Sequence, residues 1–167
     1  MGQESIKLDK IIEIFYENPS KRFTAREISA KTKIPKSTAH KYMTQLKKEK
    51  LITEENQASD SILFKTKKTF HYIQEMIKSG LIDHITKELN PSCIILFGSV
   101  RKGESDKDSD IDLFIESTKK SINLENFEKK LGHKIQAFIE DDIKKLPDRL
   151  LNNVSNGIKI TGYFKIK

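Results

Sequence analysis

The sequence has a single cysteine, Cys93, and no tryptophan among its 167 residues. One thiol cannot form an intramolecular disulfide, which excludes a disulfide-stapled secreted scaffold and favours a reducing compartment. Because Cys93 lies in the apolar run CIILF, we expect a small buried hydrophobe and not a reactive thiol. No apolar run approaches membrane-spanning length, and the first ten residues lack the apolar core of a signal peptide. We therefore expect a cytoplasmic protein with no membrane partner.

The charge is unevenly distributed along the chain. The 31 Lys and Arg residues exceed the 24 Asp and Glu residues, which gives a formal net charge of +7. Residues 1–68 contain 15 of the basic and 9 of the acidic residues, so most of the excess lies in the N-terminal portion. A basic segment beside a nearly neutral one predicts two domains with different partners. The alternative is a lysine-rich, solvated surface.

The basic portion has the pattern of three short helices followed by a hairpin. The first helix is indicated by apolar residues that share one helical face, namely Leu8, Ile11, Ile12 and Phe15. Thr24 and Glu27 form the capping box of a second helix. A third helix has an apolar inner face made by Ala39, Tyr42, Met43 and Leu46. Two short strands, LITEE and ILFKTKK, are predicted on either side of the turn-rich stretch NQASDS.

This order of elements, with the wording TAREISAKTKIPKSTAHKYMTQLKKEKLI, resembles the winged helix-turn-helix family over roughly residues 6–68. The resemblance implies double-stranded DNA as a partner, with the third helix in the major groove and the wing on the backbone. It implies DNA contacts from Lys36, Ser37, His40 and Lys41 on that helix, and from Lys65 and Lys67 in or near the wing. Many members have glycine where Lys50 stands. Such domains also often serve only as protein-interaction modules, and they are commonly dimers, so we expect a homodimer.

The remaining residues predict a helical connector at 69–89 and a small α/β domain at 90–167. The continuous apolar run at 93–97 is typical of a strand covered on both faces. Further strands are predicted at 111–115, 134–139 and 158–166, with helices at 124–131 and 147–153. The predicted fold class is therefore α+β: a winged helix-turn-helix domain at 1–68, the connector, and a C-terminal domain with a small mixed sheet.

The stretch LFGSVRKGESDKDSDIDLFIE places two carboxylates, Asp110 and Asp112, in an otherwise apolar strand. Strand alternation puts both on one face, where they repel each other unless a cation lies between them. Mg²⁺ commonly takes one or two carboxylates together with substrate phosphates. Gly98 and Ser99 follow the preceding strand, where glycine lets a phosphate approach the backbone N–H groups. The pattern predicts a site for a metal–nucleotide complex.

The segment FGSVRKGESDKDSDIDL resembles the signature of the nucleotidyltransferase superfamily with a DNA polymerase β-like palm: Gly-Ser, ten residues, Asp-x-Asp. It is especially similar to the minimal nucleotidyltransferases. The resemblance implies transfer of a nucleoside monophosphate from an NTP, with ATP expected, to a protein or RNA hydroxyl, with Mg²⁺ or Mn²⁺ as cofactor. Members are often antitoxins that modify a partner toxin. The implied site comprises the catalytic metal ligands Asp110 and Asp112 and the nucleotide-binding residues Gly98, Ser99, Arg101 and Ser109.

One feature of this family is missing. Members usually supply a third carboxylate from the next strand, and the matching segment HKIQAFIEDD has Gln136 there. An amide cannot act as a general base. Glu140, Asp141 and Asp142 follow the strand, and we expect them to cap the next helix. Two functions therefore stay open: a Mg²⁺-dependent nucleotidyltransferase, and a DNA-binding transcriptional regulator whose degenerate transferase domain senses nucleotide or mediates dimerisation.

Overall fold

The computed structural model describes residues 2–165 and divides the chain into two compact units, Met1–Thr66 and Lys67–Lys167. The division falls within one helix, α4 (Ile62–Lys78). Each unit has buried apolar residues of its own. Among the described residues, no helix combines the length and apolar character needed to cross a membrane.

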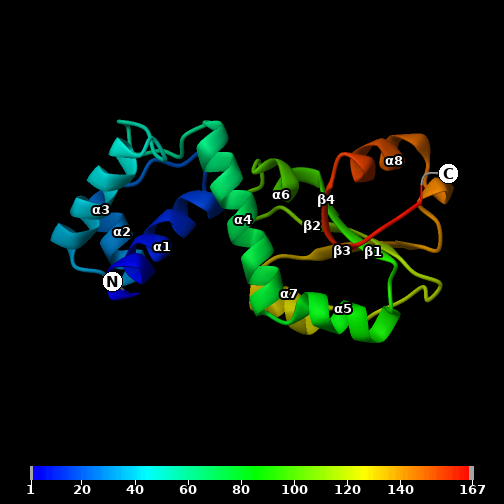
Figure 1. Cartoon of the computed structure of the whole chain (residues 1–167). Coiled ribbons are helices and arrows are strands. Elements are labelled where there is room, and N and C mark those ends of the chain that lie inside the picture. The colour runs from blue at the N-terminus through cyan, green and yellow to red at the C-terminus, as the bar shows by residue number, and fades with distance from the viewer. Residues whose placement is uncertain (1, 166–167) are drawn as a thin grey trace. The chain divides into compact units, whose positions relative to one another are not determined.

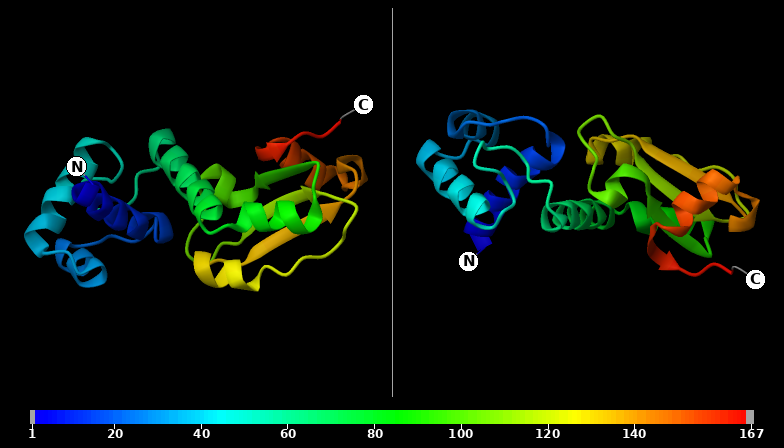
Figure 2. Two further views of the ribbon diagram at one scale, coloured as in Figure 1. Left: turned by 60° about the horizontal axis from the view of Figure 1, so that its bottom comes forward. Right: turned by 90° about the horizontal axis from the view of Figure 1, so that it is seen from above.

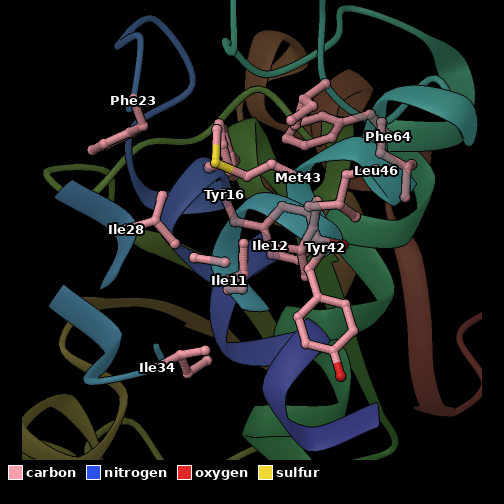
Figure 3. Packing of buried hydrophobic residues seen from close by; sticks show 14 residues of the cluster. Ile11, Ile12, Tyr16, Phe23, Ile28, Ile34, Tyr42, Met43, Leu46 and Phe64 are labelled. Carbon is pink, nitrogen blue, oxygen red and sulfur yellow. The ribbon is translucent and has the colours of Figure 1, made fainter. Parts of the chain in front are cut away.

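The first unit contains the three predicted helices, α1 (Gly2–Glu17), α2 (Ala25–Thr32) and α3 (Lys36–Lys48) (Figure 1). Apolar side chains from all three converge on one core (Figure 3). The predicted capping box forms at the start of α2. The Glu27 N–H donates to Thr24 Oγ1 at 3.2 Å, and the Thr24 N–H donates to the Glu27 carboxylate at 2.8 Å. The capping box and the apolar faces that predicted these helices are therefore also the interactions by which α2 begins and the helices pack together.

The prediction of a second hairpin strand is wrong. The segment ILFKTKK lies in α4, and the hairpin is reduced to an isolated bridge between Ile52 and Ala58. Buried residues recur every four positions along α4, which is a helical period and not the alternation of a strand: Phe64, Lys68, Tyr72 and Met76. Lys65 and Lys67 accordingly lie on a helix and not in a wing. The winged helix-turn-helix assignment stays a prediction.

The second unit is built on a four-stranded mixed sheet with the order β3-β2-β1-β4 (Figure 2). β1 (Cys93–Phe97) is antiparallel to β2 (Ile111–Glu116) and to β4 (Ile158–Gly162), whereas β2 is parallel to β3 (Ile135–Glu140). The four predicted strands are present, although β4 ends earlier than expected. The helical elements are α5 (Leu81–Leu89), α6 (Gly98–Lys102), α7 (Glu125–Leu131), the 3₁₀ helix η1 (Ile143–Lys145) and α8 (Asp148–Ser155).

Both faces of the sheet are covered, as the apolar run of β1 predicted. Ile94 and Leu96 join a cluster with residues of α4 and α5, whereas Cys93, Ile95 and Phe97 join another with residues of η1 and α8. In Figure 1, α5 and α7 lie on one side of the sheet and α8 on the other. Burial raises the pKa of Cys93 to about 11, so this thiol stays protonated and packs as a small hydrophobe.

The end of α3 has a backbone conformation that favours glycine at position 50. Lys50 has a φ of 57°, in the left-handed region that glycine adopts without steric cost. The conformation lets the Leu51 N–H donate to the Leu46 carbonyl at 2.9 Å, which satisfies a carbonyl in the last turn of the helix.

We expect Lys50→Gly to raise the free energy of unfolding by about 1 kcal/mol, the penalty that a side chain carries in the left-handed conformation. Thermal and urea unfolding followed by circular dichroism measure this change. The matched control is Glu49→Gly, because Glu49 has right-handed dihedral angles and glycine there lowers stability. A less stable Lys50→Gly protein would contradict the prediction.

Candidate active site

The site is organised by the antiparallel pairing of β1 and β2. In this register Phe97, the last residue of β1, is the partner of Asp112. Paired residues project to the same face of a sheet, so Asp112 points to the face of Phe97 and away from Ile111 and Leu113. The chain leaves β1 directly after Phe97 and enters α6 at Gly98. The Gly-Ser pair is therefore the junction between a strand and a helix, beside the Asp112 carboxylate.

Gly98 is required on two counts. Its φ is +71°, and an added Cβ would lie 1.9 Å from Asp112 Oδ2 and 2.8 Å from Asp112 Cγ. Any larger residue would both strain the backbone and displace the carboxylate. The close approach that the structure requires at Gly98 is that of Asp112. The approach of a phosphate, for which the sequence suggested glycine, stays a prediction.

Asp110 and Asp112 lie close enough to interact electrostatically. Burial raises the pKa of Asp112 above its usual value, and the neighbouring negative charge of Asp110 raises it further. Both effects disfavour the charged carboxylate when no cation is bound. A divalent cation reverses this balance, because it attracts both carboxylates and replaces the water they lose. The donor set of two aspartates fits a hard cation that completes its shell with substrate oxygens.

The position of the missing third carboxylate follows from the pairing of β2 with β3. Asp112 is in register with Gln136, whose side chain is exposed. Glu140 instead pairs with Glu116, four residues farther along the strand or about 13 Å away. The acidic run after β3 therefore lies at the other end of the sheet from Asp112.

The acidic residues after β3 have local partners. Asp142 caps η1, as its carboxylate accepts from the Lys144 N–H at 2.9 Å. Asp141 forms an ion pair with Lys145 at 2.7 Å. The expected capping role is thus confirmed for Asp142. Among residues 2–165, no group of three or more His, Cys, Asp or Glu side chains is arranged to hold a metal ion. A cation here would need oxygens from a ligand.

The other predicted nucleotide-binding residues have different surroundings. Ser99 and Arg101 belong to α6 and are partly exposed. The Ser109 hydroxyl donates to Asp106 Oδ1 at 2.9 Å and accepts from the Asp106 N–H at 2.9 Å. The hydrogen bond from Ser109 is the largest cause that lowers the pKa of Asp106, followed by the Asp108 N–H. Ser109 therefore holds the loop ahead of Asp110 together.

Several residues that no sequence pattern singled out hold this loop in place. They come from α4 and from the turn before β3: Lys68, Thr69, Tyr72 and His133. His133 is buried.

The predicted DNA-binding residues divide between two helices. Lys36, Ser37, His40 and Lys41 are all exposed on α3, opposite the buried face of that helix. Lys41 Nζ lies 3.5 Å from the Glu4 carboxylate in an exposed ion pair. Lys65 lies on α4, 2.7 Å from Asp60, and Lys67 is exposed on the same helix. Only the group on α3 forms the surface that the sequence predicted.

Residues 79–160 match a family model described as a nucleotidyltransferase domain. The matched segment contains Gly98, both aspartates and Gln136. No curated protein and no solved structure matches the chain. The match supports the nucleotidyltransferase superfamily for this part of the chain, and it leaves α4 and the whole first unit outside.

We expect Asp112→Asn to raise the free energy of unfolding at pH 7 when a chelator removes divalent cations. The folded-state pKa of Asp112 is raised, so its contribution to stability is present at low pH and is lost as the pH rises through that pKa. Asparagine resembles the protonated acid, so the variant should exceed the wild type at pH 7 and approach it as the pH falls. Urea unfolding at several pH values measures the difference.

The matched control for this comparison is Asp108→Asn, an exposed acid of the same loop that should show no such gain. Equal stability of wild type and Asp112→Asn at pH 7 would contradict the electrostatic account of the pair.

Proposed function

From the nucleotidyltransferase domain at residues 79–160 we infer that this protein transfers a nucleoside monophosphate from an NTP to a hydroxyl group. The observation that carries the proposal is the contact of Asp112 with Gly98 beside Asp110. This contact brings two carboxylates that can bind a metal ion next to a backbone turn of the kind that accommodates phosphate. We propose Mg²⁺, or Mn²⁺, as the cation and ATP as the nucleotide. We also propose a hydroxyl of a protein or RNA as the acceptor, with a partner toxin as one such protein.

The reaction follows from the chemistry of a triphosphate. The acceptor oxygen forms a bond to the α-phosphorus, the bond from that phosphorus to the bridging oxygen breaks, and pyrophosphate leaves with the electron pair. The acceptor proton passes to a base. A bound divalent cation supplies positive charge that offsets the negative charge of the triphosphate. Asp110 and Asp112 would hold that cation, while the α6 backbone and Arg101 would orient the phosphates.

Gln136 determines how fast the proposed reaction runs. Its register with Asp112 supports the proposal that Gln136 occupies the position where a third carboxylate would share the cation and take the proton of the acceptor. The amide can donate or accept a hydrogen bond, but it does not take up a proton at neutral pH. The proton must then pass to water or to a group of the acceptor complex. We therefore propose a slow transferase in which positioning and charge neutralisation remain and base catalysis is absent.

We expect Gln136→Asp to increase pyrophosphate release from ATP by about 10²-fold, at the low end of what a positioned general base contributes. Water serves as the minimal hydroxyl acceptor in this assay. The matched control is Glu140→Gln, which changes an acid at the far end of the same strand and should leave the rate unaltered.

Calorimetric titration with each Mg²⁺–NTP complex separates binding from chemistry. Binding that is lost in Asp110→Ala/Asp112→Ala supports the site, and failure of the wild type to bind any Mg²⁺–NTP overturns it. Intact binding with no pyrophosphate release from wild type or Gln136→Asp would favour the alternative function, a regulator whose second unit senses nucleotide.

We propose DNA binding as a second activity, located in the first unit. The supporting observation is the exposed face of α3, which presents Lys36, Ser37, His40 and Lys41 while its other face is buried. Residues 1–68 also hold most of the excess positive charge of the chain. Lysine near phosphate acts by charge and counterion release, whereas Ser and His can reach base edges.

We expect Lys36→Ala/Lys41→Ala to weaken binding to duplex DNA and to reduce the slope of log affinity against log salt by about 2, one for each lost phosphate contact. Gel shifts across a salt series measure both. The control is Lys87→Ala/Lys129→Ala, which removes two exposed lysines from the second unit. If no duplex is retarded at low salt, the first unit serves another purpose.

A further inference from the structure

The segment that carries the proposed nucleotide site runs from Gly98 to Asp110, and its backbone accepts hydrogen bonds from α4. Lys68 and Thr69 donate to this backbone directly, and Tyr72, on the same face of the helix, contacts it through His133. The three residues of α4 are buried. They also precede residues 79–160, so they lie outside the segment that matches the nucleotidyltransferase family. The helix therefore adds to the domain a support that the family match does not contain.

Thr69 donates a hydrogen bond to carbonyl groups at the end of α6. A helix leaves its last carbonyl groups without partners in the helix, and α6 has only five residues (Gly98–Lys102). Thr69 Oγ1 lies 3.1 Å from the Val100 carbonyl oxygen and 3.1 Å from that of Arg101. A hydroxyl has one proton, so it is shared between the two acceptors. The helix that begins at Gly98 is thereby fixed at its other end.

Lys68 and Tyr72 hold the rest of the segment. Lys68 is 0% exposed, and its ammonium donates to the carbonyl of Ser105. A buried ammonium needs such acceptors, which makes this contact costly to remove. Tyr72 acts through His133: its hydroxyl lies 3.3 Å from His133 Nε2, and His133 Nδ1 lies 2.8 Å from the Ser109 carbonyl oxygen. A carbonyl only accepts, so Nδ1 carries the proton in this bond.

The contacts are spread along the whole segment. Thr69 holds it just after Gly98 and Ser99, Lys68 holds its middle, and the Tyr72–His133 pair holds the peptide that leads into Asp110. One helix, α4, therefore holds both parts of the proposed site, the turn at Gly98 and the peptide before Asp110. An arrangement of this kind fixes the distance between the phosphate-binding turn and the metal-binding carboxylates before any ligand arrives.

We propose that α4 is a positioning element of the nucleotide site, with Thr69 and the Tyr72–His133 pair as its positioning residues. The inference rests on the proposed function, because it assigns these residues to binding of a Mg²⁺–NTP complex. None of them is a catalytic residue. Each acts through the backbone on Gly98, Asp110 or the turn between them.

The test uses the full chain with Thr69→Val, which keeps the shape of the side chain and removes the hydroxyl. We expect an affinity for Mg²⁺–ATP about tenfold lower by calorimetry, as is typical when an outer partner of a metal site is removed. Thr69→Ser keeps the hydroxyl and should restore the affinity. Thr86→Val is the matched control, since Thr86 Oγ1 donates to the Ile82 carbonyl of its own helix at 2.8 Å, on the exposed side of α5.

Hydrogen exchange of the protein without nucleotide provides a second readout. The amides of Gly103 and Glu104 donate to the carbonyls of Val100 and Ser99, and we expect them to exchange faster in Thr69→Val and at the wild-type rate in Thr86→Val. Tyr72→Phe should have the corresponding effect on residues 109–111, with exposed Tyr163→Phe as its control.

The outcomes separate this inference from the function on which it rests. A wild type that binds no Mg²⁺–NTP overturns the proposed function, and the role of α4 in binding falls with it. A wild type that binds, beside a Thr69→Val protein of unchanged affinity, overturns the present inference alone, whatever the exchange rates. Lower affinity restored by Thr69→Ser, with faster exchange in residues 98–110, establishes the positioning role.

Discussion

The contact between the Asp112 carboxylate and Gly98 is the constraint on which the site depends. It requires β1 to end at Phe97, because the next residue must have no side chain and a positive φ. It also requires the register that pairs Phe97 with Asp112. A slip by one residue would turn Asp112 toward the apolar cluster that contains Ile111 and Leu113, and would move those two side chains to the other face of the sheet. The hydrophobic core of the second unit thus specifies the position of a polar group.

The placement of Asp112 beside Asp110 lowers the stability of the folded protein when no cation is bound. Asp112 is half-buried beside a second carboxylate, and both burial and the negative charge of Asp110 disfavour its ionised form. Its close neighbour is a glycine, which contributes no side-chain donor. Groups held in an unfavourable electrostatic state are typical of functional sites, where a ligand supplies the compensating charge. The ligand that we propose, a divalent cation with a triphosphate, has the charge and the oxygen atoms that fit this requirement.

The site also depends on parts of the chain far from the two motifs. Helix α4 precedes the segment that matches the family, yet its buried face supplies hydrogen bonds to the backbone between Gly98 and Asp110. His133 comes from the turn before β3 and reaches the same backbone. Such contacts leave the two motifs with few ways to move independently. They also explain why a helix that looks like a simple connector is buried along one side.

Interactions between residues close in the sequence were sufficient to predict much of the secondary structure of this protein. The capping box at Thr24 and the burial of β1 on both faces each depend on neighbouring residues, so the sequence by itself determined those elements. The position of Asp110 on one face of a strand with Asp112 stays a prediction, because β2 begins at Ile111. The segment at 62–68 could not be assigned in this way, because a seven-residue window ended before the four-residue period of α4 became visible. The resemblance to a family suggested the place of Gln136, but only the pairing of β2 with β3 gives its register with Asp112 and puts Glu140 opposite Glu116. Tertiary structure alone decided that Thr69 and His133 hold the loop. Those relations join residues 24 to 32 positions apart, and no local pattern encodes them, because they arise only when separate strands and helices pack together.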